Sequence, residues 1–199
     1  MRIGLDFDNT IVCYDHAIEI LAEQTFSLPA GLPRTKLALR DFLRQEGREP
    51  EWTAFQGALY GPGMQHAQPF PQAIETMLII QKQGHELVIV SHRSLRPYAG
   101  PAYDLHAAAR GWVRERLESQ GLFKNGHVYF HETLAAKIAA IGSLGCDVFL
   151  DDLPEVLGDD QFPNKTQGIL FDPDGVGNGA KGPSIERWPD LTHVLAETR

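Results

Sequence analysis

Cysteine is scarce in this sequence, and long apolar segments are missing. Only Cys13 and Cys146 are cysteines, too few for the disulfide framework of a small secreted protein, so we expect two buried thiols in a reducing compartment. No stretch approaches the roughly 18 consecutive apolar residues of a transmembrane helix. Asp6 and Asp8 interrupt the amino-terminal stretch where a signal peptide needs an unbroken apolar run. We therefore expect a cytoplasmic protein with no membrane partner.

Positive charge is also in short supply. The chain has 18 lysines and arginines against 26 acidic residues, a formal net charge of −8. This balance argues against a general affinity for nucleic acid polymers, which require a basic surface. An anionic ligand would have to be small and met by local positive charge. The 199 residues are enough for one domain with its own core, as a monomer or a homodimer.

Short apolar runs alternate with segments of helical periodicity in the second half of the chain. This alternation is typical of an α/β fold with a parallel sheet, and the runs are apolar throughout, as strands covered on both faces are. The predicted strands are 3–7, 87–90, 128–130, 148–150 and, more weakly, 169–171. Apolar spacings of three and four predict helices over 74–78, 105–117 and 134–141, followed by the C-cap candidates Gly84, Gly121 and Gly145.

The first two predicted strands are separated by about 80 residues, far more than a crossover helix requires. Three short helical stripes lie in this stretch, interrupted by proline and glycine. We therefore expect residues 12–70 to form a small helical cap insert, and residues 1–11 and 71–199 to form the α/β core. The cap is expected over the carboxyl ends of the strands, where open parallel sheets bind ligands.

Acidic side chains follow two of the predicted strands. Asp6 and Asp8 are two residues apart, so their side chains begin on one face, where they repel each other unless a cation or proton lies between them. The alternative for this pair is an acidic strand end that merely caps a turn through Asn9 and Thr10. Asp151 and Asp152 end a second strand.

Parallel strands end at one edge of a sheet, so these four carboxylates converge if their strands are neighbours. Such an oxygen-rich site suits Mg²⁺, which takes one or two carboxylates and keeps its other positions for water and phosphate oxygens. Ser91 ends a third strand and brings a hydroxyl to the same edge. The candidate metal ligands are Asp6, Asp8, Asp151 and Asp152.

Lys137 is the candidate cation of this site. It lies on a predicted helix that begins near Thr133, three residues after Leu134 and four before Ile141, so it flanks the apolar stripe. The alternative is a lysine that packs its stem beside the core and extends its ammonium group to water.

The order of these residues resembles the haloacid dehalogenase superfamily of phosphohydrolases. The four motifs of that superfamily, Asp-x-Asp-x-Thr, Ser, Lys and Asp-Asp, occur in order between residues 6 and 152. The resemblance implies a Rossmann-like three-layer sandwich with a small helical cap of the first insertion class between the first two motifs. This insertion point agrees with the long gap found independently in the sequence.

The resemblance also implies roles for individual residues. Asp6 would attack phosphorus and form an aspartyl-phosphate, while Asp8 would protonate the leaving oxygen, then activate water, and give its backbone carbonyl to the metal. The other implied roles are a hydrogen bond from Ser91 to a phosphoryl oxygen, charge neutralisation by Lys137, and Mg²⁺ binding by Asp151 with Asp152 behind it. Thr10, Ser91, His92, Arg93 and Lys137 are the candidates for substrate binding.

Asp8 favours phosphate chemistry, because the dehalogenases of the superfamily lack an acid at that position. The Asp-Asp-Leu-Pro form of the last motif, 14 residues after Lys137, resembles the small-cap deoxyribonucleotidase-like branch. Asn9 stands where most members of the superfamily have glycine.

Further residues allow two readings each. Arg93 could clamp a second anionic group of the substrate, or it could be a loop residue beside a helix start. The basic residues of the insert are expected to form mostly a solvated helix face, and its aromatic residues mostly a small core: Arg34, Lys36, Arg40, Arg44, Arg48, and Tyr14, Phe42, Trp52, Phe55. The stretch 172–179 begins like a calcium loop but would place Pro183 at its twelfth position, so we expect an ordinary glycine-rich loop.

The leading hypothesis is a Mg²⁺-dependent phosphatase acting on a small phosphorylated metabolite, either a nucleotide or a sugar phosphate. A phosphomutase or phosphotransferase would use the same chemistry with another acceptor, and a weakly catalytic phosphate-binding regulator would keep the motifs. A receiver-like signalling module is disfavoured, because receivers carry an adjacent acidic pair after the first strand, whereas here that pair comes late.

Overall fold

The computed structural model describes residues 1–124, 126–175 and 182–197. The chain forms two compact units. The core unit comprises residues 1–12, 69–93 and 116–199, and the insert unit comprises residues 13–68 and 94–115. The expected cap boundaries did not include residues 94–115, which follow the second motif strand. These residues pack within the insert unit, where the Trp112 indole donates a hydrogen bond to the Ala67 carbonyl at 3.0 Å.

The core unit is built on a six-stranded parallel sheet in the order β5-β4-β1-β6-β7-β8. Its strands are β1 (Arg2–Leu5), β4 (Glu86–His92), β5 (Val128–His131), β6 (Val148–Asp151), β7 (Gln167–Phe171) and β8 (Ser184–Ile185). The five predicted strands and the α/β class are confirmed. The edge strand β8 was not predicted, because two residues carry no readable alternation. A separate two-stranded sheet pairs β2 (Val12–Cys13) with β3 (Gln68–Pro69).

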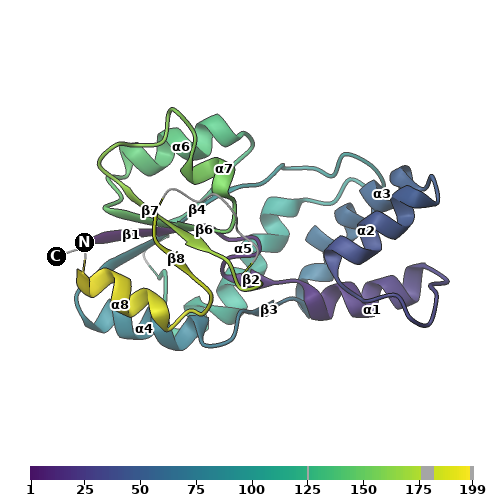
Figure 1. The fold of residues 1–199 in the computed structure, drawn as a ribbon, viewed down its shortest axis with the longest axis horizontal. Coiled ribbons are helices and arrows are strands. Elements are labelled where there is room, and N and C mark those ends of the chain that lie inside the picture. The colour runs from purple at the N-terminus through teal and green to yellow at the C-terminus, as the bar shows by residue number, and fades with distance from the viewer. Residues whose placement is uncertain (125, 176–181, 198–199) are drawn as a thin grey trace. The chain divides into compact units, whose positions relative to one another are not determined.

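Helices cover both faces of the large sheet, which gives the expected three layers. In Figure 1, helices α4 (Ala73–Lys82) and α8 (Asp190–Glu197) lie on one face, and α6 (Leu134–Ser143) and α7 (Pro154–Leu157) lie on the other. A short 3-10 turn, η2, spans Glu118–Gln120. Gly84, Gly121 and Gly145 all have positive φ, at 85°, 96° and 64°, so the predicted left-handed positions are confirmed.

The insert unit is helical. It contains α1 (Asp15–Thr25), α2 (Lys36–Gln45), α3 (Glu49–Tyr60), the 3-10 turn η1 (Pro62–His66) and most of α5 (Leu105–Arg116). Tyr14, Trp52 and Phe55 are buried, as expected for a small core. The four arginines of the insert named above form ion pairs with nearby acidic side chains, for example Arg44 with Glu49 and Arg48 with Glu51. Acidic residues of the insert therefore neutralise much of its positive charge.

Two further expectations concern particular segments. Across the described residues, no helix combines the length and the apolar character that crossing a bilayer would require. The predicted glycine-rich loop over 172–179 lies partly outside the described residues, which stop at 175 and resume at 182.

Candidate active site

Three of the predicted site residues, Asp6, Ser91 and Asp151, lie at the carboxyl ends of the neighbouring strands β1, β4 and β6. Strand β1 pairs with β4 on one side and β6 on the other, in the registers Leu5↔Ile89 and Leu5↔Leu150. The backbone N–H of Asp6 donates to the Leu150 carbonyl at 2.8 Å, so the main chain stays paired with β6 as it leaves β1. This pairing brings Asp6 next to the end of β6.

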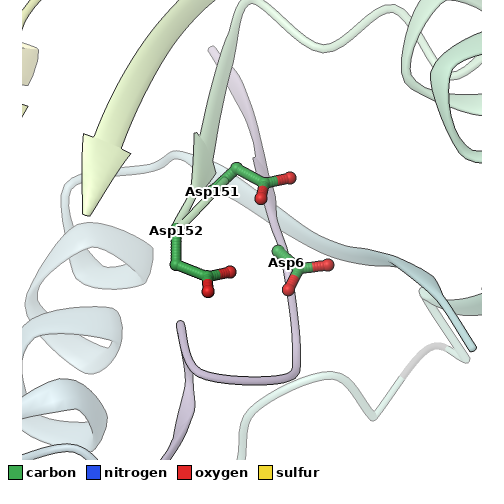
Figure 2. Close-up of side chains that lie close together, drawn as sticks. All are labelled: Asp6, Asp151 and Asp152. Carbon is green, nitrogen blue, oxygen red and sulfur yellow. The ribbon is translucent and has the colours of Figure 1, made fainter. Parts of the chain in front are cut away.

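Three carboxylates gather at this edge. Figure 2 shows Asp151 and Asp152 at the end of one strand and Asp6 just beyond its neighbour. One carboxylate oxygen from each lies within 4.8 Å of the others. Asp6 and Asp151 are buried and Asp152 is half-buried. Such a cluster requires positive charge, since buried carboxylates are costly unless they are paired.

Lys137 supplies part of that charge. Helix α6 begins after Thr133, whose hydroxyl accepts a hydrogen bond from the Ala136 N–H at 3.1 Å, and one turn later Lys137 points inward. Its ammonium group donates to Asp6 Oδ1 at 2.7 Å and to Asp151 Oδ2 at 2.6 Å. The side chain is only 2% exposed, so the alternative of a lysine that reaches out to water is wrong.

The carboxylates and the lysine shift one another's ionisation. Burial alone would lower the pKa of Lys137, but the charges of Asp6 and Asp151 outweigh it and hold that pKa above its ordinary value. Burial raises the pKa of Asp6 and of Asp151. The charge of Asp8 adds to this rise for Asp6, and the charge of Asp6 adds to it for Asp151, while Lys137 offsets only part of the effect. The fully ionised cluster would carry more negative charge than one ammonium group can balance, so without a metal ion its carboxylates bind protons more readily than free aspartates do.

Asp8 is not part of this three-carboxylate cluster. Its Oδ1 accepts a hydrogen bond from Arg93 Nη1 at 2.5 Å. The structure therefore brings three of the four predicted carboxylates into one cluster. The Asp8 side chain pairs with Arg93 instead, although its charge still raises the pKa of Asp6. Arg93 was a candidate for substrate binding, with a loop residue beside a helix start as the alternative. In the structure it is buried, with its guanidinium 5.8 Å from the Phe7 ring centroid.

The turn after β1 holds Thr10 against the cluster. Asn9 has φ of +60°, a left-handed conformation that asparagine tolerates better than most residues with a Cβ, which accounts for asparagine where the superfamily usually has glycine. The Thr10 hydroxyl donates to Asp152 Oδ1 at 3.4 Å. Its backbone carbonyl accepts from the Trp188 indole at 3.1 Å. Thr10 therefore holds the side chain of Asp152, one of the candidate metal ligands, by a hydrogen bond. Its expected role in substrate binding stays a prediction.

Trp188 supports the site through this hydrogen bond to Thr10, and the sequence analysis did not single it out as a site residue. The one available signal was that a buried tryptophan needs a partner for its indole N–H. Replacing Trp188 with phenylalanine removes this donor and part of a fully buried ring, so we expect the free energy of unfolding to fall by about 1–3 kcal/mol. Urea denaturation measures this loss, and a change below about 0.5 kcal/mol would contradict it.

Ser91 and His92 lie at the end of β4 with different surroundings. Ser91 is 1% exposed, and its Oγ makes no hydrogen bond of ordinary geometry with any described residue, although it is near enough to Asp6 to favour the ionised carboxylate. A buried hydroxyl of this kind calls for a further partner. His92 is exposed, and its Nε2 lies 3.2 Å from the Glu132 carbonyl.

The residues present fit a divalent cation. When ionised, the carboxylates of Asp6, Asp8, Asp151 and Asp152 with the cations Lys137 and Arg93 have a formal net charge of −2. One Mg²⁺ would balance this charge. The donor atoms are carboxylate oxygens, which hard cations prefer. We expect Asp6, Asp151 and Asp152 to hold the ion.

Magnesium is expected to stabilise the protein, and more so at higher pH. Because the pKa values of Asp6 and Asp151 are raised on folding, their contribution to stability is present at low pH and is lost as the pH rises through those values. Mg²⁺ binds the ionised forms and replaces the missing protons. At about 100 times its Kd it should raise Tm by roughly 5–10 °C, with a larger shift near pH 8 than near pH 5.

Differential scanning calorimetry with matched variants tests this expectation. Asp152→Asn keeps an acceptor for Thr10 but removes one carboxylate of the cluster, so the Mg²⁺ shift should shrink. Asp160→Asn changes an exposed aspartate and should keep the full shift. Equal shifts in both variants would place the ion elsewhere.

No family model matches the chain, and no curated protein matches it. Solved structures do match, at low sequence identity and almost full length. A haloacid dehalogenase (HAD) family hydrolase from Deinococcus radiodurans, with bound phosphate and sodium, is 17% identical at a TM-score of 0.59, covering 99% of this chain and 95% of that one. A protein assigned as a HAD hydrolase from Bacillus subtilis, bound to magnesium, is 16% identical at a TM-score of 0.62, covering 98% and 97%.

A third similar structure is a HAD phosphatase from Thermococcus onnurineus, 17% identical at a TM-score of 0.54, covering 98% of this chain and 97% of that one. These likenesses show that the chain has the fold of haloacid dehalogenase-type hydrolases.

Proposed function

We propose that this protein is a Mg²⁺-dependent phosphatase that hydrolyses a small phosphorylated metabolite through an aspartyl-phosphate on Asp6. The observation that carries the proposal is the buried bridge of Lys137 between Asp6 and Asp151, with Asp152 in the same cluster. A lysine and several carboxylates at one sheet edge form a site in which an anionic phosphoryl group and a metal ion fit together.

The chemistry has two steps. In the first, a carboxylate oxygen of Asp6 attacks phosphorus, the bond to the leaving oxygen breaks, and Asp8 gives that oxygen a proton. In the second, Asp8 takes a proton from water as the water oxygen attacks phosphorus, and the bond between phosphorus and Asp6 breaks. Inorganic phosphate leaves, and both aspartates return to their starting states.

The surrounding residues orient the carboxylate of the nucleophile, Asp6, and stabilise its negative charge. Lys137 fixes Asp6 Oδ1 by a 2.7 Å hydrogen bond, which orients the carboxylate and leaves a positive charge beside the incoming phosphoryl oxygens. The buried Ser91 hydroxyl would donate to one of those oxygens and so gain its missing partner. Mg²⁺, when bound, supplies charge neutralisation. Together these groups must lower a barrier by about 20 kcal/mol or more relative to water.

The similar structures support this proposal at the level of chemistry. One of them contains phosphate and another contains magnesium, and a third is a phosphatase. For substrates we favour nucleoside monophosphates, followed by sugar phosphates, because the last acidic motif resembles that of the deoxyribonucleotidase-like branch.

A panel of phosphate monoesters tests the proposed function. Purified protein with Mg²⁺ is incubated with nucleotides, sugar phosphates and an aryl phosphate, and inorganic phosphate is measured. We expect release from at least one ester and none after Mg²⁺ is removed with a chelator. Failure across the panel, despite Mg²⁺ binding by calorimetry, would favour a phosphate-binding regulator. A phosphorylated alcohol in place of inorganic phosphate would show a phosphotransferase.

A further inference from the structure

Arg93 is a buried cation beside the acid of the proposed mechanism. It follows β4, two residues after Ser91, and its backbone N–H donates to the His131 carbonyl at 2.7 Å. This bond fixes the start of the side chain at the sheet edge. The guanidinium then reaches across to Asp8 Oδ1. The side chains of Arg93 and Asp8 are 3% and 19% exposed.

This burial separates Arg93 from the other ion-paired arginines. In the described part of the chain, every other arginine in an ion pair has a side chain at least 24% exposed. Burying a guanidinium costs free energy that its ion pair repays only in part, so such a pair is weak evidence of a purely stabilising role. Its place beside Asp8 and Ser91 points to catalysis.

We propose that Arg93 is a positioning residue that fixes the Asp8 carboxylate for proton transfer to the leaving group. The inference rests on the proposed function and deepens it. With Oδ1 accepting this charge-assisted hydrogen bond, the carboxyl group has one orientation. The proton that Asp8 gives to the leaving group is then carried by its second oxygen, which has one direction. Proton transfer requires that oxygen within about 2.6–3.2 Å of the leaving oxygen, and a misplacement of about 1 Å costs on the order of 100-fold in rate.

The dependence of rate on the leaving group separates this role from others. An alkyl phosphate must receive a proton as it leaves, whereas dinitrophenyl phosphate leaves as a stable phenolate. Arg93→Met is therefore expected to lower kcat/KM for an alkyl phosphate by about 100-fold and for dinitrophenyl phosphate by only a few-fold. Arg93→Lys, which keeps the charge but loses the planar fork, should fall between.

Matched variants complete the test. Arg187→Met removes an exposed arginine that also pairs with an aspartate, Asp190, and should leave the ratio of the two rates unchanged. In an Asp8→Asn background, Arg93→Met should cost little more, because the residue it positions is already disabled. If Arg93→Met fails to fold, the test uses Arg93→Lys alone, which should still lose more kcat/KM on the alkyl phosphate than on dinitrophenyl phosphate.

The outcomes distinguish this inference from the proposed function. Equal losses on both substrates would overturn the positioning role. A rise in KM without a change in kcat would also overturn it, and would instead make Arg93 a substrate clamp. If the unaltered protein hydrolyses neither ester, nor any other in the panel, the proposed function fails first.

Discussion

Replacing Asp6 with asparagine is expected to abolish turnover while the protein remains folded. The substitution removes the nucleophilic oxygen, and loss of a covalent nucleophile costs on the order of 10⁴-fold or more in kcat. The amide keeps an acceptor for Lys137, which now bonds Asp6 Oδ1 at 2.7 Å. Phosphate release from the best ester of the panel measures the effect.

The same variant should be at least as stable as the unaltered protein when Mg²⁺ is absent. Burial and the charge of Asp8 raise the pKa of Asp6, so its ionised form is unfavourable in the folded state. Removing that charge should add up to about 2 kcal/mol to the free energy of unfolding. Chemical denaturation in chelator tests this. A less stable and inactive variant would leave loss of folding as the explanation.

Replacing Lys137 with methionine is expected to cause the largest loss of stability. Methionine fills a similar volume but leaves Asp6 and Asp151 buried without the ammonium group that donates to both. Removing one partner of a buried ion pair typically costs about 3–5 kcal/mol. Activity should also be lost, because the ammonium group that donates to the nucleophile Asp6 would be gone.

The loss in Lys137→Met should depend on pH in a defined direction. Without the lysine the carboxylate pKa values rise further, so the folded state binds more protons than the unfolded state and gains stability as the pH falls. The deficit should therefore be greatest near pH 8 and smaller near pH 5. Lys82→Met, at an exposed position in the last turn of α4, serves as control and should cost about 0.5 kcal/mol or less. A deficit that does not change with pH would contradict the charge explanation.

The sheet and the edge that carries the candidate site were predictable because their signals are local. Strands buried on both faces give near-continuous apolar runs, and the polar residue that ends each run must lie at one edge of a parallel sheet. Lys137 was identified by its place beside an apolar stripe. Its burial and its two carboxylate partners then follow from the need of a buried charge for partners.

The long-range contacts around the site, an ion pair and a hydrogen bond, could not be predicted from the sequence in the same way. Nothing in the spacing of Asp8 and Arg93, 85 residues apart, shows that they form an ion pair. The spacing of Ser91 and Arg93 did offer a hint, since residues two apart on an extended segment share a face. The bond from Trp188 to the Thr10 carbonyl spans 178 residues, and only tertiary structure can show it.

The central claim is that Asp6 is phosphorylated during turnover, and rapid acid quenching tests it most directly. Protein mixed with Mg²⁺ and its best substrate is quenched within the first turnover, digested, and analysed by mass spectrometry. We predict one added phosphoryl group on the peptide that contains Asp6, labile to hydroxylamine and absent from Asp6→Asn. Full turnover with no phosphoryl group on the protein, or with one on another residue, would contradict the mechanism.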